Sequence, residues 1–255
     1  MVEEFILKKN RRKKNGIQTV LLMIMTLLLI TTIGFALLIV GSERLQDRKN
    51  IANAFYDKDK NAGNNPEDYV IGTYRLMRKV GAKGVGKWYS QAEFDVEKFN
   101  DYDGEVLELG RACVHKDFRS KVVMQMLWNG LAAYMFDFDI KLMFGCGSFL
   151  GTDVNSAKEA LSYLYYNHTA DGKLEINART ENAVPYPLVP KEEIDERKAF
   201  ISLPTMIKGY LRVGCKVSKS IFVDYSFNTF DVCIIFETKN LKQSYLEHYE
   251  KKIKG

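Results

Sequence analysis

The pattern of apolar and polar positions predicts five segments along the chain. Residues 1–16 form a basic tail, and residues 17–41 form an uncharged apolar run. Residues 42–68 are polar and include KDKNAGNNPED, which is typical of a linker or surface loop. The alternating pattern of a folded domain occupies residues 69–240, and residues 241–255 form a charged tail.

The first half of the domain combines strand patterns with one amphipathic helix. YVIGTYRLM at 69–77 alternates as a half-buried strand does, EVLELGRACV at 105–114 reads as a second strand, and IKLMFGC at 140–146 as a buried one. Between the last two, residues 122–137 place an apolar face on a helix, made of Val123, Met126, Leu127, Leu131 and Tyr134.

The second half predicts further helices and closing strands. Asn155 or Ser156 is a suitable cap for a helix, whereas residues 169–190 hold three of the five prolines and predict no long element. Residues 203–213 look helical, and SIFVDYSF and FDVCIIFET look like strands. Strands interleaved with helices in this order predict an α/β or α+β domain with a mixed sheet.

The apolar run from Ile17 to Gly41 is long enough to span a membrane as a helix. Its 25 residues reach roughly 37 Å, against a hydrocarbon core of roughly 30 Å. It lacks the short apolar region and small-residue exit of a cleaved signal peptide. Six basic residues precede it and few follow, which favours a cytoplasmic N-terminus with the main domain on the far side.

Charge and cysteine spacing exclude two classes of function. Of the net charge of +5, residues 1–16 carry +4, so the body is nearly neutral and nucleic-acid binding is not indicated. The cysteines (Cys113, Cys146, Cys215 and Cys233) are widely spread, so we expect reduced thiols and no metal site.

Two glycine-rich segments resemble catalytic motifs but depart from them. GAKGVGKW at 81–88 has Trp88 where a phosphate-binding P-loop needs Ser or Thr, so we expect a surface hairpin. GCGSFLG at 145–151 places Ser148 outside the G-x-S-x-G nucleophile pattern, and only three histidines are available as bases. We therefore expect a loop at a strand end, approached closely by ligand or backbone.

The segment ELGRACVHKDFRSKVVMQMLW has the strongest functional pattern. A strand carrying Glu108 and Arg111 leads through a basic loop to a helix that begins near Val122. A helix N-terminus with nearby cations suits a phosphate or pantetheine arm, although the same pattern is found in ordinary solvated turns. The cations in question are Lys116, Arg119 and Lys121.

Here the sequence resembles the L-ornithine N-alpha-acyltransferases of bacterial ornithine lipid synthesis, also labelled hemolysin-like. The matching blocks, in the family's order, are VIGTYRLM, WYSQAEFDV, ELGRACVHKDFR, LWNGLAAY, FGCGSFLGTD, LPTMIKGYLRVG and FNTFDVCI. The resemblance implies a GNAT-like mixed sheet flanked by helices and splayed to admit a pantetheine arm. It also implies a 3-hydroxyacyl group on acyl carrier protein as donor, L-ornithine as acceptor, lyso-ornithine lipid as product, and no cofactor beyond the carrier's own phosphopantetheine thioester.

The resemblance also suggests roles for individual residues. Glu108 is the candidate base for the ornithine α-amine, and Arg111 holds the substrate carboxylate or orders the site. A structural ion pair between these two residues is the alternative. Asp153 or Asp231 is the candidate partner of the ornithine side-chain amine, with Ser148 as a further substrate-binding residue.

Two further groups of roles concern the donor. Backbone N–H groups around Ala112–Val114 are candidates for binding the thioester oxygen as it gains charge. The cations Lys116, Arg119 and Lys121 are the candidates for contact with the carrier and its pantetheine arm.

The front of the chain departs from the family. Gly147 and Leu150 replace residues that are usually Ala and Pro, and the L-R-Y-x-V-F-type and C-D-H-L-type segments are missing. Three explanations stay open: an anchor inserted against the charge rule, a remodelled pocket wall, or a changed reading frame before about residue 58. We expect an inner-membrane-associated enzyme with its domain in the cytoplasm, where acyl carrier protein resides. The alternatives are an inactive membrane-tethered remnant and an acyl-homoserine-lactone synthase.

Overall fold

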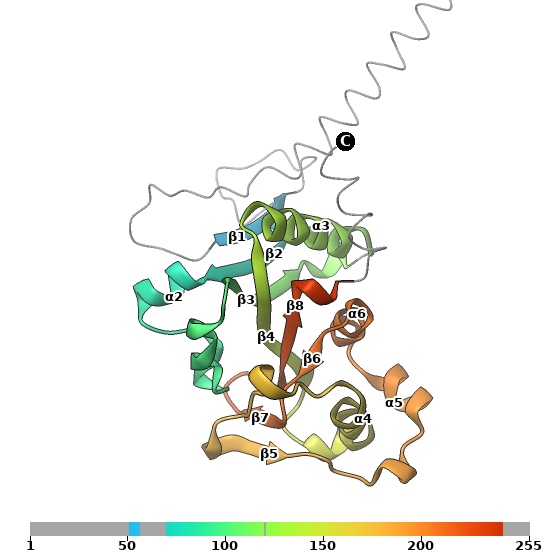
Figure 1. Ribbon diagram of the computed structural model, residues 1–255. Helices are drawn as coiled ribbons and strands as arrows, with labels where there is room; N and C mark the ends of the chain where they lie inside the picture. Colours follow the sequence, from blue (N-terminus) through green and yellow to red (C-terminus); the bar gives the residue numbers. More distant parts are fainter. Residues whose placement is uncertain (1–50, 57–69, 120, 242–255) are drawn as a thin grey trace, which may run out of the picture.

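The computed structural model describes residues 51–56, 70–119 and 121–241, which build one mixed sheet flanked by helices (Figure 1). The sheet has the order β1-β2-β3-β4-β8-β7-β5, and β6 pairs with β8 beside β7. Neighbouring strands are antiparallel except β3 and β4, which are parallel. The predicted mixed sheet with flanking helices is therefore confirmed.

The elements alternate along the chain as the sequence pattern predicted. The strands are β1 Ile51–Tyr56, β2 Val70–Arg78, β3 Glu105–Val114, β4 Ile140–Leu150, β5 Ala183–Pro185, β6 Lys216–Val217, β7 Ser220–Asp224 and β8 Thr229–Glu237. The α-helices are α2 Lys79–Val85, α3 Lys121–Asp137, α4 Lys158–His168, α5 Glu196–Ser202 and α6 Thr205–Val213. Short 3₁₀ helices include η2 Ser90–Ala92, η3 Val96–Asp101, η4 Lys116–Phe118 and η5 Val154–Ala157.

The two faces of the sheet are covered by different parts of the chain. Helices α3, α4 and α6 pack on one face through residues such as Leu127, Leu161 and Ile207. The opposite face is covered by α2, by the segment around η2 and η3, and by residues near 170–178, with Trp88 and Phe94 fully buried. Successive strand residues point to alternate faces, so each strand contributes to both cores.

Three segments differ from their predictions. Ile51–Tyr56, expected in the linker, forms β1, because its backbone hydrogen-bonds to β2 at the sheet edge. The predicted glycine hairpin is helix α2, which ends at Gly86 with a φ of 84°, a conformation that favours glycine. The predicted loop at 145–151 is mostly strand β4, paired with β8 as far as Leu150.

The glycines of β4 serve close packing within the sheet. A side chain at Gly145 would place its Cβ 2.1 Å from the carbonyl oxygen of Leu109 on β3. At Gly147 the Cβ would lie 2.9 Å from a side-chain carbon of Ile234 on β8. The expected close backbone approach is therefore correct, although it occurs inside a strand.

The predicted membrane helix at 17–41 lies outside the described residues. Within the described ranges, no helix is both long and apolar enough to cross a bilayer. The basic tail at 1–16 and most of the charged tail at 241–255 also lie outside them.

The cysteines are free thiols, as expected from their spacing. Cys215 and Cys233 are buried, Cys146 is half-buried and Cys113 is exposed. The expectation of core thiols therefore holds for two of the four, and Cys146 lies at the site described next.

Candidate functional site

The site begins where the two parallel strands part. Strands β3 and β4 pair only from Glu105 opposite Ile140 to Glu108 opposite Phe144. Beyond this point β3 continues along β2, while β4 continues along β8. The sheet therefore has an opening between the two strands, the splay that the sequence resemblance implied.

An apolar cleft occupies this opening on the face covered by α3 and α6. It encloses about 870 Å³ of space, part of it open solvent. Most of its wall is apolar, with contributions from α3, α6, β3, β4 and β8, including Leu109, Leu131, Ala132, Met135, Met143, Val213, Ile234 and Phe236. A wall of this composition suits a long hydrocarbon chain.

Two tyrosine hydroxyl groups lie in the wall of this cleft. Tyr74 of β2 and Tyr210 of α6 hydrogen-bond to each other through their hydroxyls, and Trp128 stacks on the Tyr210 ring at 5.7 Å. Burial raises the pKa of Tyr74 to about 12, so the hydroxyl stays protonated. Two hydroxyls carry two protons but share one hydrogen bond, which leaves one donor without an acceptor among the described contacts.

A β-bulge lies at the end of the cleft, at Arg111. On β2, Thr73 pairs with Cys113 and Arg75 pairs with Gly110, so Tyr74 faces both Arg111 and Ala112. Arg111 has a φ of 51°, which a non-glycine residue rarely adopts. A bulge leaves backbone N–H groups out of the ladder, and here both bulge residues line the cleft.

The side chain of Arg111 is exposed beside this bulge. Its guanidinium donates a hydrogen bond to the Tyr89 hydroxyl at 3.0 Å and lies 5.7 Å from the centre of the Phe227 ring. It makes no ion pair with Glu108 in the described structure, where Glu108 instead faces Arg75 at 3.8 Å. The alternative of a Glu108–Arg111 ion pair is therefore wrong.

Glu108 is fully buried on the face opposite the cleft. Its Oε1 accepts hydrogen bonds from the Ser90 amide at 2.5 Å and the Ser90 hydroxyl at 2.6 Å. Its Oε2 accepts one from the Tyr89 amide at 2.9 Å. These contacts fasten the segment around η2 to the sheet, so both oxygens already have partners.

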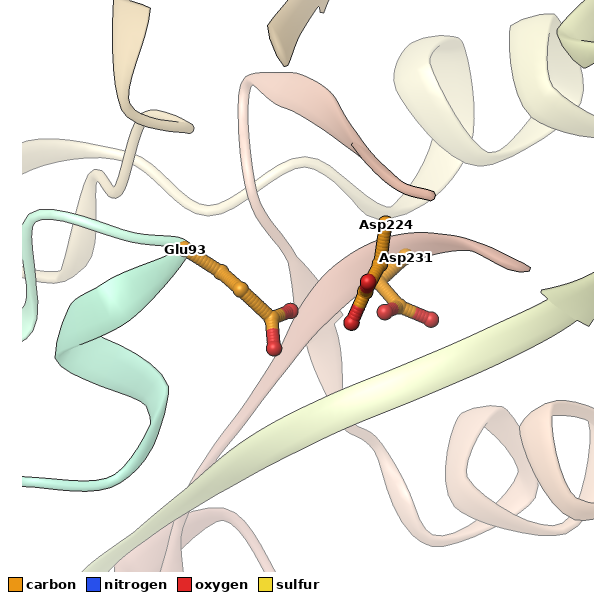
Figure 2. A group of neighbouring side chains, drawn as sticks. All are labelled: Glu93, Asp224 and Asp231. Carbon is orange, nitrogen blue, oxygen red and sulfur yellow. The ribbon is translucent and has the colours of Figure 1, made fainter. Parts of the chain in front are cut away.

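A cluster of three carboxylates lies on the same face as Glu108. Glu93 follows η2, Asp224 ends β7 and Asp231 lies in β8, and their oxygens approach within 4.8 Å of one another (Figure 2). Glu93 and Asp231 are 8% and 3% exposed. Like charges at this depth repel strongly, which favours either protonation of a carboxyl group or a bound cation.

The electrostatics of the cluster follow from burial and crowding. Burial and the nearby Asp231 raise the pKa of Glu93 to about 7, despite a hydrogen bond from Cys146 that lowers it. Burial also raises the pKa of Asp231. Asp231 Oδ1 is buried and has no hydrogen-bond partner in the described structure, while its other oxygen accepts a hydrogen bond from Thr229.

Cys146 connects the cluster to the cleft. Its thiol donates a hydrogen bond to Glu93 Oε2 at 3.2 Å, and the residue also lines the cleft. Ser148, two residues further along β4, lies opposite Asp231 in the β4–β8 pairing. The apolar cleft and the acidic cluster therefore meet at the splay, on opposite faces of the sheet.

The remaining predicted residues lie apart from this junction. Asp153 is exposed and accepts a hydrogen bond from the Asn155 amide at 3.0 Å, which caps η5. Lys116 and Arg119 are exposed in and after η4, and Arg119 donates to the Val114 carbonyl at 3.3 Å. Lys121 begins α3, and its side chain lies outside the described part of the structure.

The structure adds residues that the sequence did not single out. Glu93, Asp224 and Cys146 meet at the cluster, and Tyr74 with Tyr210 meet in the cleft. All except Asp224 lie inside the blocks that carried the family resemblance. That membership was the available signal, but the blocks do not reveal which side chains converge.

The acidic cluster is the group of side chains best placed to hold a cation. Among the described residues, Glu93, Asp224 and Asp231 form the one set of His, Cys, Asp or Glu side chains whose ligand atoms are close enough to share an ion. Carboxylates bind an organic ammonium group as well as a metal ion. The geometry therefore indicates that a bound group would be positively charged, but it does not identify that group.

Comparisons with known proteins give a consistent family. Residues 54–129 match the family described as an acetyltransferase (GNAT) domain. The chain is 39% identical over 188 residues to an L-ornithine N(alpha)-acyltransferase of Rhodobacter capsulatus, covering 74% of this chain and 72% of the relative. It is 38% identical over 185 residues to the same-named protein of Rhizobium meliloti, covering 72% of this chain and 62% of the relative.

A solved structure is also similar, at a much lower level. The aminoglycoside 6'-N-acetyltransferase from Enterococcus faecium shares 10% identity and a TM-score of 0.34, with 74% of each chain covered.

Proposed function

The chain belongs to the L-ornithine N(alpha)-acyltransferase family, and we propose that it transfers a 3-hydroxyacyl group from acyl carrier protein to the α-amine of L-ornithine, giving lyso-ornithine lipid. The observation that carries this proposal is the junction at the splay of β3 and β4. There an apolar cleft on one face meets an acidic cluster on the other. A hydrophobic acyl donor and a cationic amino-acid acceptor need these two environments side by side.

The apolar cleft suits the acyl chain. The apolar wall along α3 and α6 would remove the methylene groups of the chain from water. Each buried methylene group contributes about 0.8 kcal/mol to the binding free energy. The spare hydroxyl donor of the Tyr74–Tyr210 pair suits a chain that carries an oxygen, as a 3-hydroxyacyl group does. An unsubstituted chain leaves that donor without a partner, which favours the hydroxylated donor.

The bulge at Arg111 and Ala112 suits the thioester carbonyl. Its backbone N–H groups are held rigidly by the strand, and they border the cleft where the carbonyl end of an acyl chain would lie. Donors fixed in this way stabilise the oxygen as it gains negative charge during attack. The exposed Arg111 guanidinium supports the carboxylate of the acceptor or the polar arm of the donor.

The acidic cluster suits the ammonium groups of ornithine. Asp231, with its unpartnered oxygen, and Asp224 supply the negative charge that a side-chain ammonium requires. Ser148 lies opposite Asp231 and adds a hydroxyl. Asp153 already caps η5, so Asp231 is the better of the two predicted partners.

The donor's carrier protein would approach from the side of η4 and α3. Lys116 and Arg119 are exposed there, and Lys121 begins the helix, so this edge offers cations to an acidic carrier. The thioester arrives on the carrier's phosphopantetheine, so the proposed reaction needs no further cofactor. An inner-membrane location with a cytoplasmic domain fits a lipid product and a cytosolic carrier, and it rests on residues 17–41 serving as an anchor.

The direct test is acyl transfer by the purified full chain in detergent or vesicles. We expect lyso-ornithine lipid, identified by mass spectrometry, from 3-hydroxyacyl carrier protein and L-ornithine, with unchanged rates when a metal chelator is added. An acyl-homoserine lactone as the main product would favour the synthase alternative. Failure to acylate any amine would favour the inactive remnant.

A further inference from the structure

Glu93 is a buried carboxylate whose backbone is held on both sides. Its N–H donates to the Ser90 carbonyl at 3.0 Å as η2 ends, and its carbonyl accepts from the Arg179 amide at 2.7 Å. The side chain extends from this fixed point toward the sheet and faces the two aspartates of the β7–β8 hairpin (Figure 2). Its position is therefore set by the fold.

The carboxylate of Glu93 lies one side chain away from the cleft. The thiol of Cys146 donates to its Oε2, and Cys146 lines the cleft at the splay. No hydrogen bond to its Oε1 is present among the described residues. Asp231 Oδ1 is buried without a hydrogen-bond donor in the described structure and faces the same small space, where a cationic group would give both carboxylates a partner.

We propose that Glu93 is the catalytic base that takes a proton from the attacking α-ammonium group, while Asp231 and Asp224 hold the second ammonium group of the same substrate. This inference rests on the proposed function, which it deepens by dividing the carboxylates between two tasks. The substrate class that it names is an amino acid with two ammonium groups.

The proton and bond changes balance without a further reactant. The α-ammonium gives one proton to the Glu93 carboxylate, and the neutral nitrogen then attacks the thioester carbon. The new C–N bond forms as the C–S bond breaks, and the second proton lost from nitrogen leaves with the pantetheine sulfur as a thiol. Glu93 returns its proton to solvent before the next cycle.

Glu93 suits this task better than Glu108 does. The oxygens of Glu108 accept three hydrogen bonds from Tyr89 and Ser90, so both oxygens already have partners within the fold. Burial and Asp231 instead raise the pKa of Glu93 to about 7, where a general base works most effectively at neutral pH.

The titratable and charged groups around Glu93 come from several elements. Cys146 of β4, Asp231 of β8 and Asp224 of β7 face its carboxylate. Arg179, whose amide holds the Glu93 carbonyl, directs its guanidinium to Glu97 and to the Gln91 carbonyl. The net surroundings are thus acidic, and a bound diammonium substrate would lower the pKa of Glu93 by opposite charge.

The test compares wild type, Glu93→Gln and the matched control Glu97→Gln, each as the full chain. Acyl transfer to ornithine is measured as kcat/KM from pH 5.5 to 9.5. At pH 7 we expect Glu93→Gln to lose about 100- to 1,000-fold, and the loss to shrink as rising pH deprotonates the free amine. Glu97→Gln should keep a wild-type profile, and thermal melting reports whether each variant is folded.

A second acceptor distinguishes the loss of proton removal from other causes of reduced activity. Hydroxylamine is largely unprotonated at pH 7, so its acylation needs no base, and we expect Glu93→Gln to retain most of this activity. Equal loss with both acceptors, a loss independent of pH, or full activity with ornithine would overturn the assignment. If the enzyme acylates another amine instead of ornithine, and that acylation depends on Glu93 in the same way, Glu93 is still the base and the proposed acceptor is wrong.

Discussion

The two faces of the sheet offer opposite environments although they are built from the same strands. In β8, Ile234 and Phe236 line the apolar cleft, whereas Asp231 lies in the acidic cluster. In β4, Met143 faces the cleft, and Cys146 reaches both the cleft and Glu93. The alternation of side chains along a strand thus makes one face apolar and the other acidic. In the reaction that we propose, the acyl chain and the cationic acceptor meet at the splay.

Filling the cleft should disable the apolar face alone. Ala132 lies in the cleft wall on α3, and Ala132→Phe removes space for about three or four methylene groups. At about 0.8 kcal/mol each, we expect kcat/KM for long acyl donors to fall about 100-fold. Short donors and the KM for ornithine should change little.

Its control is Ala133→Phe, on the same helix but outside the cleft lining. Steady-state kinetics with donors of increasing chain length make the measurement. An equal loss for short and long donors would mean that the cleft does not hold the chain.

Removing one charge from the cluster should disable the acidic face alone. Asp231→Asn loses a charge-assisted contact worth about 1.5–3 kcal/mol, so we expect the KM for ornithine to rise by about 10- to 100-fold. The KM for the acyl donor should stay the same. Asp153→Asn is the comparison, since Asp153 caps η5. If Asp153→Asn raised the KM and Asp231→Asn did not, the cation site would have to be placed elsewhere.

Changing Glu108 should affect folding more than chemistry. Glu108→Gln turns an amide group toward the N–H donors of Tyr89 and Ser90, and we expect a loss of about 2 kcal/mol in the free energy of unfolding. Activity per folded molecule should fall less than about 3-fold, since a lost general base costs at least about 100-fold. Urea denaturation and acyl transfer on the same samples distinguish the two. A large loss of activity at unchanged stability would return Glu108 to the chemistry.

The smallest expected effect is a pH-dependent gain in stability from Glu93→Gln. The pKa of Glu93 rises from 4.5 in the unfolded chain to about 7 in the folded one, so the folded state binds this proton more tightly. Wild type therefore loses stability as pH rises from about 4.5 to about 7, whereas the neutral glutamine does not. At pH 8 we expect Glu93→Gln to have a higher Tm than wild type, by about 2–4 °C for each kcal/mol gained in the free energy of unfolding. At pH 4 we expect no gain. An identical difference in Tm at both pH values would show that Glu93 is not desolvated.

Much of the architecture could be predicted because strand and helix periodicity are local properties. Glu105–Val114 was predicted with the bounds that the structure has, and the α3 helix differs by one residue at its start. The helix α2 was missed because its glycines favour turns in isolation. Within the site, Arg111, Ser148 and Asp231 were predicted and lie at the splay or the cluster.

By itself, the sequence determined the alternation of apolar and polar positions, the order of elements and the family blocks. Only the tertiary structure brings Glu93 together with Asp224 and Asp231, which lie more than a hundred residues later in the chain. It also decides that the Glu108 carboxylate accepts its hydrogen bonds from Ser90 and Tyr89. Periodicity tells which residues share a face of one strand, but the partners across a sheet depend on how distant strands pair and where they part. For this protein, that parting of β3 and β4 creates the site.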